Sequence, residues 1–366
     1  MVMSLTEAVK KTLAVITAGA AVAALAACVS NDETATPAPS AAPGSSTGTL
    51  LPGEPDVNSD GKVVIGVLSP GDINDNGYYE SFVVKAEAFA RAQGWTVIKR
   101  GSVPVSEALT AARALCRQRA DMVAIGASEL KDAIPASEDA VCAKTAWYVP
   151  SSANVPQTPK IMLSSDDPNQ SMLVAGYAAG LLMQARNTTK AGFVTGPEAD
   201  FTKIASAAFL AGIRELVPGA TLVTTYTGDF DDSGKAREAT QAQLSQGVGA
   251  IYPYLGGATD AATALANSAK AITLTPGTDR CASTSPAFDV SVLFDPGDYF
   301  AAALQLYAAG KLEMGITKTW QLGVDPYPTV KLCKGTPEQN AKLAAFIADI
   351  GRGKIDPAAE VRKLGS

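Results

Sequence analysis

The sequence of 366 residues contains no histidine. This absence excludes Ser-His-Asp and Cys-His catalytic groups, histidine-ligated metal sites, and the usual general base near neutral pH. Charged residues make up only 18% of the chain, and 30 basic against 36 acidic residues give a net charge of −6. No block of Lys or Arg supplies the basic surface that nucleic acids require. Catalysis by carboxylates, Lys or Tyr is still open, but the composition argues against an enzyme, and no nucleic-acid partner is expected.

The N-terminus predicts the compartment. Lys10 and Lys11 precede a small-residue apolar run, 12–27, that is too short to span a membrane, so residues 1–27 have the layout of a secretory signal peptide. The run ends in Leu25-Ala26-Ala27-Cys28, which resembles a bacterial lipobox. We therefore expect acylation of Cys28 after cleavage and a lipid-anchored protein on the extracytoplasmic face of the cell membrane. The alternative is an ordinary signal peptide with a chance cysteine.

Residues 28–60 are rich in Pro, Ser, Thr, Ala and Gly and contain no aromatic residue, Lys or Arg. Such a segment cannot bury enough apolar surface to fold, so it is predicted to be a disordered tether. Its end, Asp56–Gly61, has the spacing of the first half of a calcium loop. The acid expected at the twelfth position is missing, because Val67 stands there and a strand begins at Val63. We interpret this segment as a polar turn, and no metal site is expected.

Four cysteines follow Cys28 and allow three pairings. Export favours disulfides, and pairing of neighbours closes the shortest loops, Cys116–Cys142 and Cys281–Cys333. Buried free thiols are the alternative. No C-x-x-C spacing points to a metal or redox function.

From Lys62 onward, apolar runs with strand character alternate with helical patterns, beginning with a strand at Val63–Leu68 and a helix at Tyr78–Gln93. This alternation predicts an α/β fold with parallel sheets covered by helices on both faces. Two successive series predict two doubly wound lobes that hinge about a cleft. We assign 61–165 plus about 275–325 to lobe 1, and 166–274 plus about 326–366 to lobe 2. A further helix is expected near Leu130–Ala143.

Ligands of doubly wound sheets bind at the carboxyl ends of the strands. The loop after the first strand carries Asn74, Asp75 and Tyr78, whose amide, carboxylate and phenol suit a polar ligand with a ring. Ser165 and Asp166 follow a later strand. The sequence has no G-x-G-x-x-G and no P-loop, so neither a nucleotide phosphate nor a cofactor is expected.

Several motifs occur in a recognisable order: Ile73–Tyr78, Gln170–Ala179, Ala191–Gly196 and Tyr226–Asp232. In order and spacing they resemble the basic membrane lipoprotein family of ABC-transporter substrate-binding proteins, many of which bind nucleosides. The resemblance covers roughly Val63–Gly315. It implies a fold like that of type I periplasmic binding proteins, and it implies that Gly256, Gly257 and Asp279 face the ligand.

Three departures bear on the ligand. An Asp that follows the fourth strand in the family has no clear match near Trp147–Pro150. Ala205 stands where the family has a Phe that stacks on the base, and Phe201, one helical turn earlier, is the candidate substitute. Phe294 stands where the family has a Lys that reaches the ribose. The resemblance therefore supports a binding protein more strongly than it supports nucleoside specificity.

The sequence predicts a lipid-anchored, monomeric binding protein that delivers a small polar ligand, a nucleoside or a sugar-like compound, to an ABC permease without catalysis. In this interpretation Asp75 and Asp279 accept hydrogen bonds from the ligand, and Tyr78 and Phe201 stack on its ring. One alternative is a sensor that presents its ligand to a membrane signalling receptor. A secreted hydrolase that uses carboxylates is a second alternative. The candidate ligand-binding residues are Asn74, Asp75, Tyr78, Ser165, Asp166, Phe201, Gly256, Gly257 and Asp279.

Overall fold

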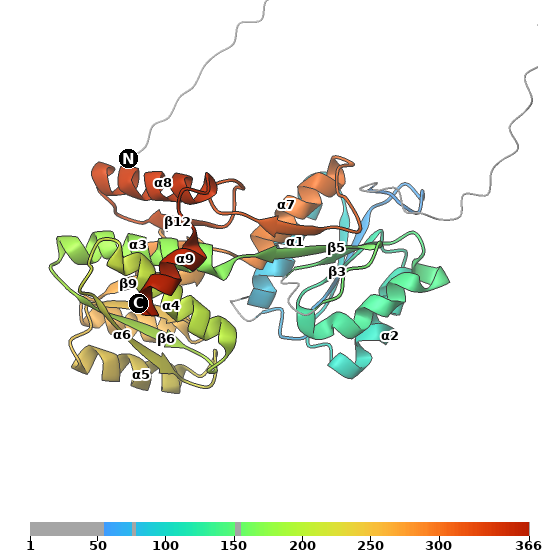
Figure 1. Ribbon diagram of the computed structural model, residues 1–366. Helices are drawn as coiled ribbons and strands as arrows, with labels where there is room; N and C mark the ends of the chain where they lie inside the picture. Colours follow the sequence, from blue (N-terminus) through green and yellow to red (C-terminus); the bar gives the residue numbers. More distant parts are fainter. Residues whose placement is uncertain (1–54, 75–77, 151–154, 366) are drawn as a thin grey trace, which may run out of the picture. The chain divides into compact units, whose positions relative to one another are not determined.

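The strands form two mostly parallel sheets (Figure 1). The structure, a computed structural model, describes residues 55–74, 78–150 and 155–365. In this part of the chain each sheet has six strands. Across the first sheet the order is β11 (Thr317–Trp320), β5 (Ile161–Asp166), β4 (Ala146–Val149), β3 (Met122–Ile125), β1 (Val64–Leu68) and β2 (Thr96–Arg100). Across the second it is β12 (Thr329–Leu332), β10 (Val290–Leu293), β9 (Ile272–Gly277), β8 (Ala250–Tyr254), β6 (Lys190–Thr195) and β7 (Thr221–Tyr226).

Adjacent strands pair in parallel, except that β12 runs antiparallel to β10. The central strands are buried on both faces and are therefore almost wholly apolar. The α/β prediction with two doubly wound sheets is confirmed.

Helices cover both faces of the first sheet. They are α1 (Tyr78–Gln93), α2 (Ala108–Arg117) and α7 (Pro296–Ala308), with the short 3-10 helices η1 (Val105–Glu107), η2 (Ser128–Glu138) and η3 (Ala140–Cys142). Side chains of β1 alternate between two cores: Ile65 and Val67 pack beneath α1 and α7, whereas Leu68 packs beneath α2. Figure 1 shows α1 and α7 side by side, although they come from distant parts of the chain. Their contact includes stacked Phe82 and Phe300 rings, 4.4 Å apart.

The second sheet is covered by α3 (Pro168–Ala185), α4 (Asp200–Arg214), α5 (Ser233–Ser245), α6 (Thr259–Ser268), α8 (Pro337–Gly351) and α9 (Pro357–Arg362), followed by η4 (Lys363–Gly365). Two glycines allow the close contact of α3 with α4. A Cβ at Gly176 would lie 2.0 Å from the Phe209 carbonyl oxygen, and one at Gly212 would lie 1.9 Å from the Leu173 carbonyl oxygen. The two backbones therefore meet at a distance that only glycine permits. No described helix combines the length and hydropathy of a membrane span.

Within the described residues the chain passes between the sheets three times, from β5 to α3, from β10 to α7 and from β11 to β12. The lobe boundary predicted near residue 274 differs from this topology, because β10, which ends at Leu293, lies in the second sheet beside β9. An apolar run fits the interior of either sheet equally well. Its periodicity therefore predicts a strand without assigning it to a sheet.

The segment that enters the first sheet is ordered by a buried acid. Asp121 is fully buried and accepts hydrogen bonds from the Val64 amide and the Asn58 side chain, each at 2.8 Å. Arg119 Nε lies 2.7 Å from the carboxylate of Asp60. Residues 55–60, placed in the disordered tether by the sequence prediction, are therefore held against the sheet by polar contacts that composition does not reveal. In the part of the chain that the structure describes, no cluster of side chains has the composition of a metal site.

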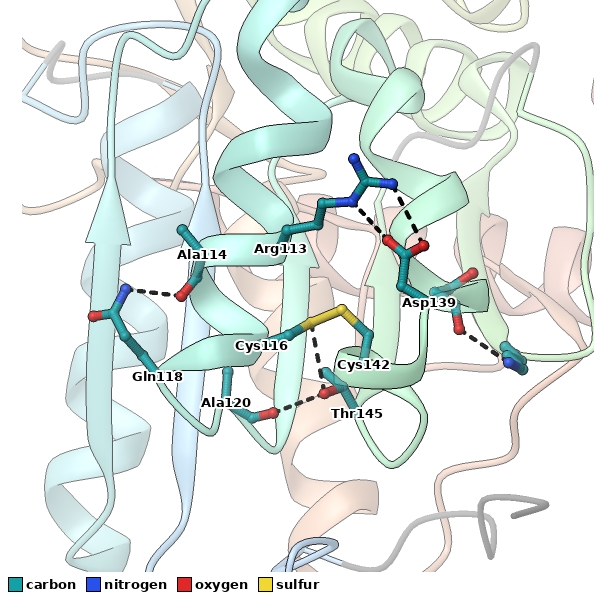
Figure 2. Close-up of a disulfide and its surroundings, with 10 residues drawn as sticks. Arg113, Ala114, Cys116, Gln118, Ala120, Asp139, Cys142 and Thr145 are labelled. Carbon is teal, nitrogen blue, oxygen red and sulfur yellow. Dashed lines mark hydrogen bonds and ion pairs between the residues drawn. A yellow bond between two sulfur atoms is a disulfide. The ribbon is translucent and has the colours of Figure 1, made fainter. Parts of the chain in front are cut away.

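The helix expected near Leu130–Ala143 is replaced by η2 and η3. Pro135 lies inside η2 and lacks the amide proton that a regular helix needs. A disulfide, Cys116–Cys142, ties η3 to α2, with a Cα–Cα distance of 5.1 Å (Figure 2). Figure 2 also shows a second link between these segments, in which Arg113 Nε donates to Asp139 Oδ2 at 2.7 Å.

Candidate ligand-binding site

A cavity of about 780 Å³ opens at the carboxyl ends of β8, β9 and β10. Tyr78, Ser81 and Lys85 of α1 line one wall. The last residues of β9 and the residues that follow the three strands line the rest. The cavity is thus bounded by elements packed on both sheets. Its volume and place match those of small-molecule sites in doubly wound proteins.

The cations of the cavity wall are paired with acids of the same chain. Lys85 Nζ lies 2.6 Å from Asp298 Oδ1. Arg280 forms an ion pair with Asp260 through both of its terminal nitrogens and also lies over the Phe288 ring, 4.7 Å from its centre. Because their charges are already compensated, these two cations offer little to an anionic ligand. The arrangement suits an uncharged polar molecule.

A buried carboxyl lies behind the α1 wall. Asp295 is 1% exposed and caps α7 by accepting a hydrogen bond from the Gly297 amide at 2.7 Å. It also accepts one from the Ser81 hydroxyl. Burial raises the pKa of Asp295 to about 7, against the weaker opposing effect of the Gly297 hydrogen bond. Near neutral pH this carboxyl is therefore protonated in an appreciable fraction of molecules.

Two aromatic residues line the cavity. Tyr78 begins α1 and its ring contacts Tyr79 edge-on at 5.3 Å. Phe294 follows β10 directly, and its ring lies 6.0 Å from that of Tyr254 at the end of β8. Such rings can stack on the flat face of a ligand.

The glycine pair after β8 is fixed by the neighbouring loop. The Gly257 amide donates to Asp231 Oδ1 at 2.5 Å, and the Gly256 amide donates to the Phe230 carbonyl oxygen at 3.0 Å. A Cβ at Gly256 would lie 2.6 Å from Asp231 Oδ1. Glycine is therefore needed here for the close approach of Asp231, while the pair lines the cavity with backbone.

The cavity brings together three of the predicted residues, Tyr78, Gly256 and Gly257. Asn74 lies apart from it, donating from both its amide groups to Asp72 Oδ1 at 3.0 and 3.1 Å. Asp75 and the lipidation residue Cys28 lie outside the described residues.

Phe201 and Asp279 have other surroundings. Phe201 is 47% exposed, and its ring lies 6.2 Å from that of Phe230. It therefore adjoins the glycine loop through Phe230 instead of lining the cavity. Asp279 pairs with Lys331 at 2.8 Å in a separate groove, and the hydrogen bond from Lys331 lowers the pKa of Asp279.

Ser165 and Asp166 lie at the first passage between the sheets. The Ser165 hydroxyl is 3.4 Å from that of Thr319. Asp166 lies beside the Tyr299 hydroxyl, and burial raises the pKa of Asp166 to about 6. The Tyr299 ring stacks on Trp320, with ring centres 5.6 Å apart. These contacts link the three chain segments that connect the two sheets. In this structure Ser165 and Asp166 therefore lie beside these connections and not in the cavity.

Sequence reasoning missed Ser81, Lys85, Arg280, Phe294 and Asp295 as cavity residues. Phe294 and Asp295 follow a strand directly, so the rule that identified the other loops also applies to them. Lys85 and Ser81 lie on a helical face for which the sequence gives no partner. Arg280 is adjacent to the predicted Asp279, and only the turn geometry decides which of the two reaches the cavity.

Two doubly wound sheets with a cavity at their strand ends define the fold of type I periplasmic solute-binding proteins. Residues 62–326 match the Bmp family, described as "ABC transporter substrate-binding protein PnrA-like". The chain belongs to this family, as its motifs predicted. The family is one of substrate-binding proteins, which agrees at a coarse level with the prediction of a protein that is not an enzyme.

Individual relatives are distant. The chain is 30% identical over 89 residues to a CD4+ T-cell-stimulating antigen of Listeria monocytogenes, and equally to that of Listeria innocua. The match covers 24% of this chain and 24% of each relative, so it spans about a quarter of the length of these curated proteins.

Solved structures share the fold. An ABC transporter solute-binding protein from Conexibacter woesei is 19% identical, with a TM-score of 0.66 over 80% of this chain and 98% of that one. A glucose-galactose binding protein from Geobacillus stearothermophilus is 15% identical, with a TM-score of 0.51 over 75% and 99% of the two chains.

Proposed function

We propose that this protein is a lipid-anchored, extracytoplasmic receptor that captures an uncharged, ring-bearing solute and delivers it to an ABC importer, with nucleosides as the leading ligand class. The observation that carries this proposal is the cavity at the ends of β8, β9 and β10, lined by two rings and by cations that are already paired. Family membership supports the transport role. Hinged closure of the two sheets around the ligand would exclude water and strengthen its hydrogen bonds.

Sugar specificity is the second candidate. Phe294 occupies the place of the Lys that the family resemblance assigns to the ribose, and a ring also stacks well on the apolar face of a sugar. The glucose-galactose binding protein has the same fold, although this likeness carries no information on the ligand.

The ligand class is tested by calorimetry and thermal shift on the full chain, using adenosine, guanosine, uridine, D-glucose and D-galactose. A nucleoside bound with micromolar affinity, about 8 kcal/mol, should raise the melting temperature clearly at millimolar concentration. Stabilisation by a sugar alone would reject nucleoside specificity but would agree with the proposed role as a solute receptor. No response to any of the five would reject the proposed ligand classes.

The anchor and the transport role have separate tests. Cells supplied with radiolabelled palmitate should label the chain, and Cys28→Ser should abolish both labelling and recovery in the membrane fraction. Uptake of the bound solute should fall when the protein is deleted from its host. Normal uptake with loss of a transcriptional response to the solute would favour the sensor instead.

A further inference from the structure

The two disulfides in the described part of the chain differ in exposure. Cys116 and Cys142 are 5% and 1% exposed, within the core beneath α2 (Figure 2). Cys281 and Cys333 are both half-buried, and both line an open groove of about 370 Å³. A small thiol reagent therefore reaches the second disulfide far more readily than the first.

The exposed disulfide connects the ligand cavity to β12. Cys281 follows Arg280 directly, and Cys333 follows the end of β12, with a Cα–Cα distance of 4.8 Å between the bridged residues. Arg280 lines the cavity, whereas Cys281 and Cys333 line the separate groove. The bridge thus holds the turn after β9 from the side of the groove, and the same turn carries Arg280 on the side of the cavity.

Polar contacts around the sulfurs fix the same turn. The Arg280 amide donates to the buried Ser291 hydroxyl oxygen at 3.0 Å, and that oxygen lies 3.3 Å from the sulfur of Cys281. Asp279 accepts from the Cys281 amide at 3.1 Å and pairs with Lys331, two residues before Cys333. The covalent bond and these contacts together hold the backbone of Arg280 in one place.

We propose that Cys281–Cys333 is a positioning element of the ligand site: the oxidised bridge holds Arg280 against Asp260 at the cavity wall, and reduction of the bridge weakens ligand binding. This inference rests on the proposed function and adds redox regulation to the same site. The reductant is a dithiol. It supplies two electrons and two protons, the S–S bond breaks to give two cysteine thiols, and the dithiol is oxidised to a disulfide.

The consequence for binding follows from the Arg280–Asp260 pair. Once the bridge is open, the turn keeps the hydrogen bond from the Arg280 amide to Ser291 but loses its covalent bond to the residue after β12. The Arg280 side chain then samples positions away from Asp260. Asp260 then faces the cavity as an unpaired carboxylate. A ligand that fits the cavity with Arg280 paired to Asp260 must re-form this pair when it binds to the reduced protein. The cost of re-forming the pair reduces the affinity of the ligand.

The test uses the full chain with Cys28→Ser, so that no third thiol competes, and compares Cys281→Ser/Cys333→Ser with the matched control Cys116→Ser/Cys142→Ser. Amide hydrogen exchange is measured in the turn 278–283, before and after treatment with dithiothreitol. We expect exchange there to accelerate by about tenfold or more on reduction and in the first variant, and to return on reoxidation. The control variant should unfold more easily but show unchanged exchange in the turn.

Adenosine and D-galactose serve as binding probes in the same samples. Affinity for the probe that binds should fall about fivefold to tenfold on reduction, and Arg280→Ala should lose a similar amount with no further loss on reduction. Unchanged exchange in the reduced turn, or equal losses of affinity in the two disulfide variants, would overturn the inference. If neither probe binds, guanosine, uridine and D-glucose take their place, and failure of all five rejects the ligand proposal. The exchange measurement decides the positioning role in either case.

Discussion

The carboxylate of Asp231 accepts a hydrogen bond from the backbone amide of Gly257 at 2.5 Å. One residue follows β7 and the other follows β8, and these two strands flank β6. The bond therefore links two loops at the carboxyl ends of parallel strands. Its donor belongs to the glycine pair that lines the ligand cavity. The shape of this cavity wall therefore depends on a residue that does not line it.

Asp231→Ala should weaken ligand binding without much loss of stability. The exposed carboxylate contributes little to folding, but the glycine loop loses its side-chain anchor. We expect affinity to fall about fivefold to tenfold by calorimetry, the equivalent of roughly 1 kcal/mol for one hydrogen bond. Asp232→Ala is the matched control, because Asp232 caps α5 and accepts from Gly234 and Lys235. It should lower the melting temperature and leave affinity intact; the opposite pattern would contradict the anchoring role.

Phe294→Leu should reduce affinity for a ring-bearing ligand by about tenfold, because it removes the stacking surface while keeping the side chain apolar. Phe201→Leu is the comparison, since the Phe201 ring stacks on Phe230 and is absent from the cavity wall. We expect it to leave affinity within twofold of the wild type. If Phe201→Leu instead causes the larger loss of affinity, Phe201 performs the stacking role of the family's Phe. The ligand then lies nearer α4.

Gly176→Ala should destabilise the protein by about 2–4 kcal/mol, because its methyl group would meet the Phe209 carbonyl oxygen at 2.0 Å and force α3 away from α4. Urea denaturation measures the change. Gly219→Ala serves as the control, since a Cβ there meets nothing within 4 Å and its φ lies outside the left-handed range. That variant should be neutral or slightly stabilised. Equal stability of the two variants would show that the helices tolerate separation.

Asp295→Asn should change how stability depends on pH. The folded-state pKa of about 7 lies above the ordinary value of 3.8, so Asp295 favours folding in its neutral form and its contribution is lost as pH rises from about 4 through 7. Asn cannot ionise. Its stability relative to the wild type should therefore increase between pH 4 and pH 8, by at most about 4 kcal/mol for a shift of this size.

Chemical denaturation without ligand at both pH values measures this difference. Asp232→Asn is the control, because backbone hydrogen bonds, chiefly from Lys235, lower the pKa of Asp232. Because a lowered pKa places the titration of Asp232 below pH 4, its relative stability should stay nearly constant between pH 4 and pH 8. A pH-independent difference for Asp295→Asn would mean that this carboxyl is not neutral in the folded protein below pH 7.

Much of the fold was accessible from the sequence because it follows from local patterns. The unbroken apolar run of β1 and the helical spacing of α1 predict their elements closely. Sheet membership is a different matter. The partners of β10 depend on hydrogen bonds to β9 and β12, which no local pattern encodes.

The candidate site was accessible only in part. Three predicted residues lie close to the ends of strands or helices, where α/β proteins bind their ligands: Gly256, Gly257 and Tyr78. Lys85 reaches the cavity from within α1, and its pairing with Asp298 requires α7 to pack beside that helix. Asp279 and Arg280 are neighbours with opposite surroundings, and the sequence gives no orientation for either.

The late position of β11 and β12 in the chain has a consequence for synthesis. β11 forms one edge of the first sheet beside β5, and β12 forms one edge of the second beside β10. A ribosome must therefore extend the chain past Trp320 before the first sheet gains β11, and past Leu332 before the second gains β12. Prematurely terminated products that stop ahead of Thr317 would display β5 and β10 as uncovered apolar edges, and such fragments should precipitate.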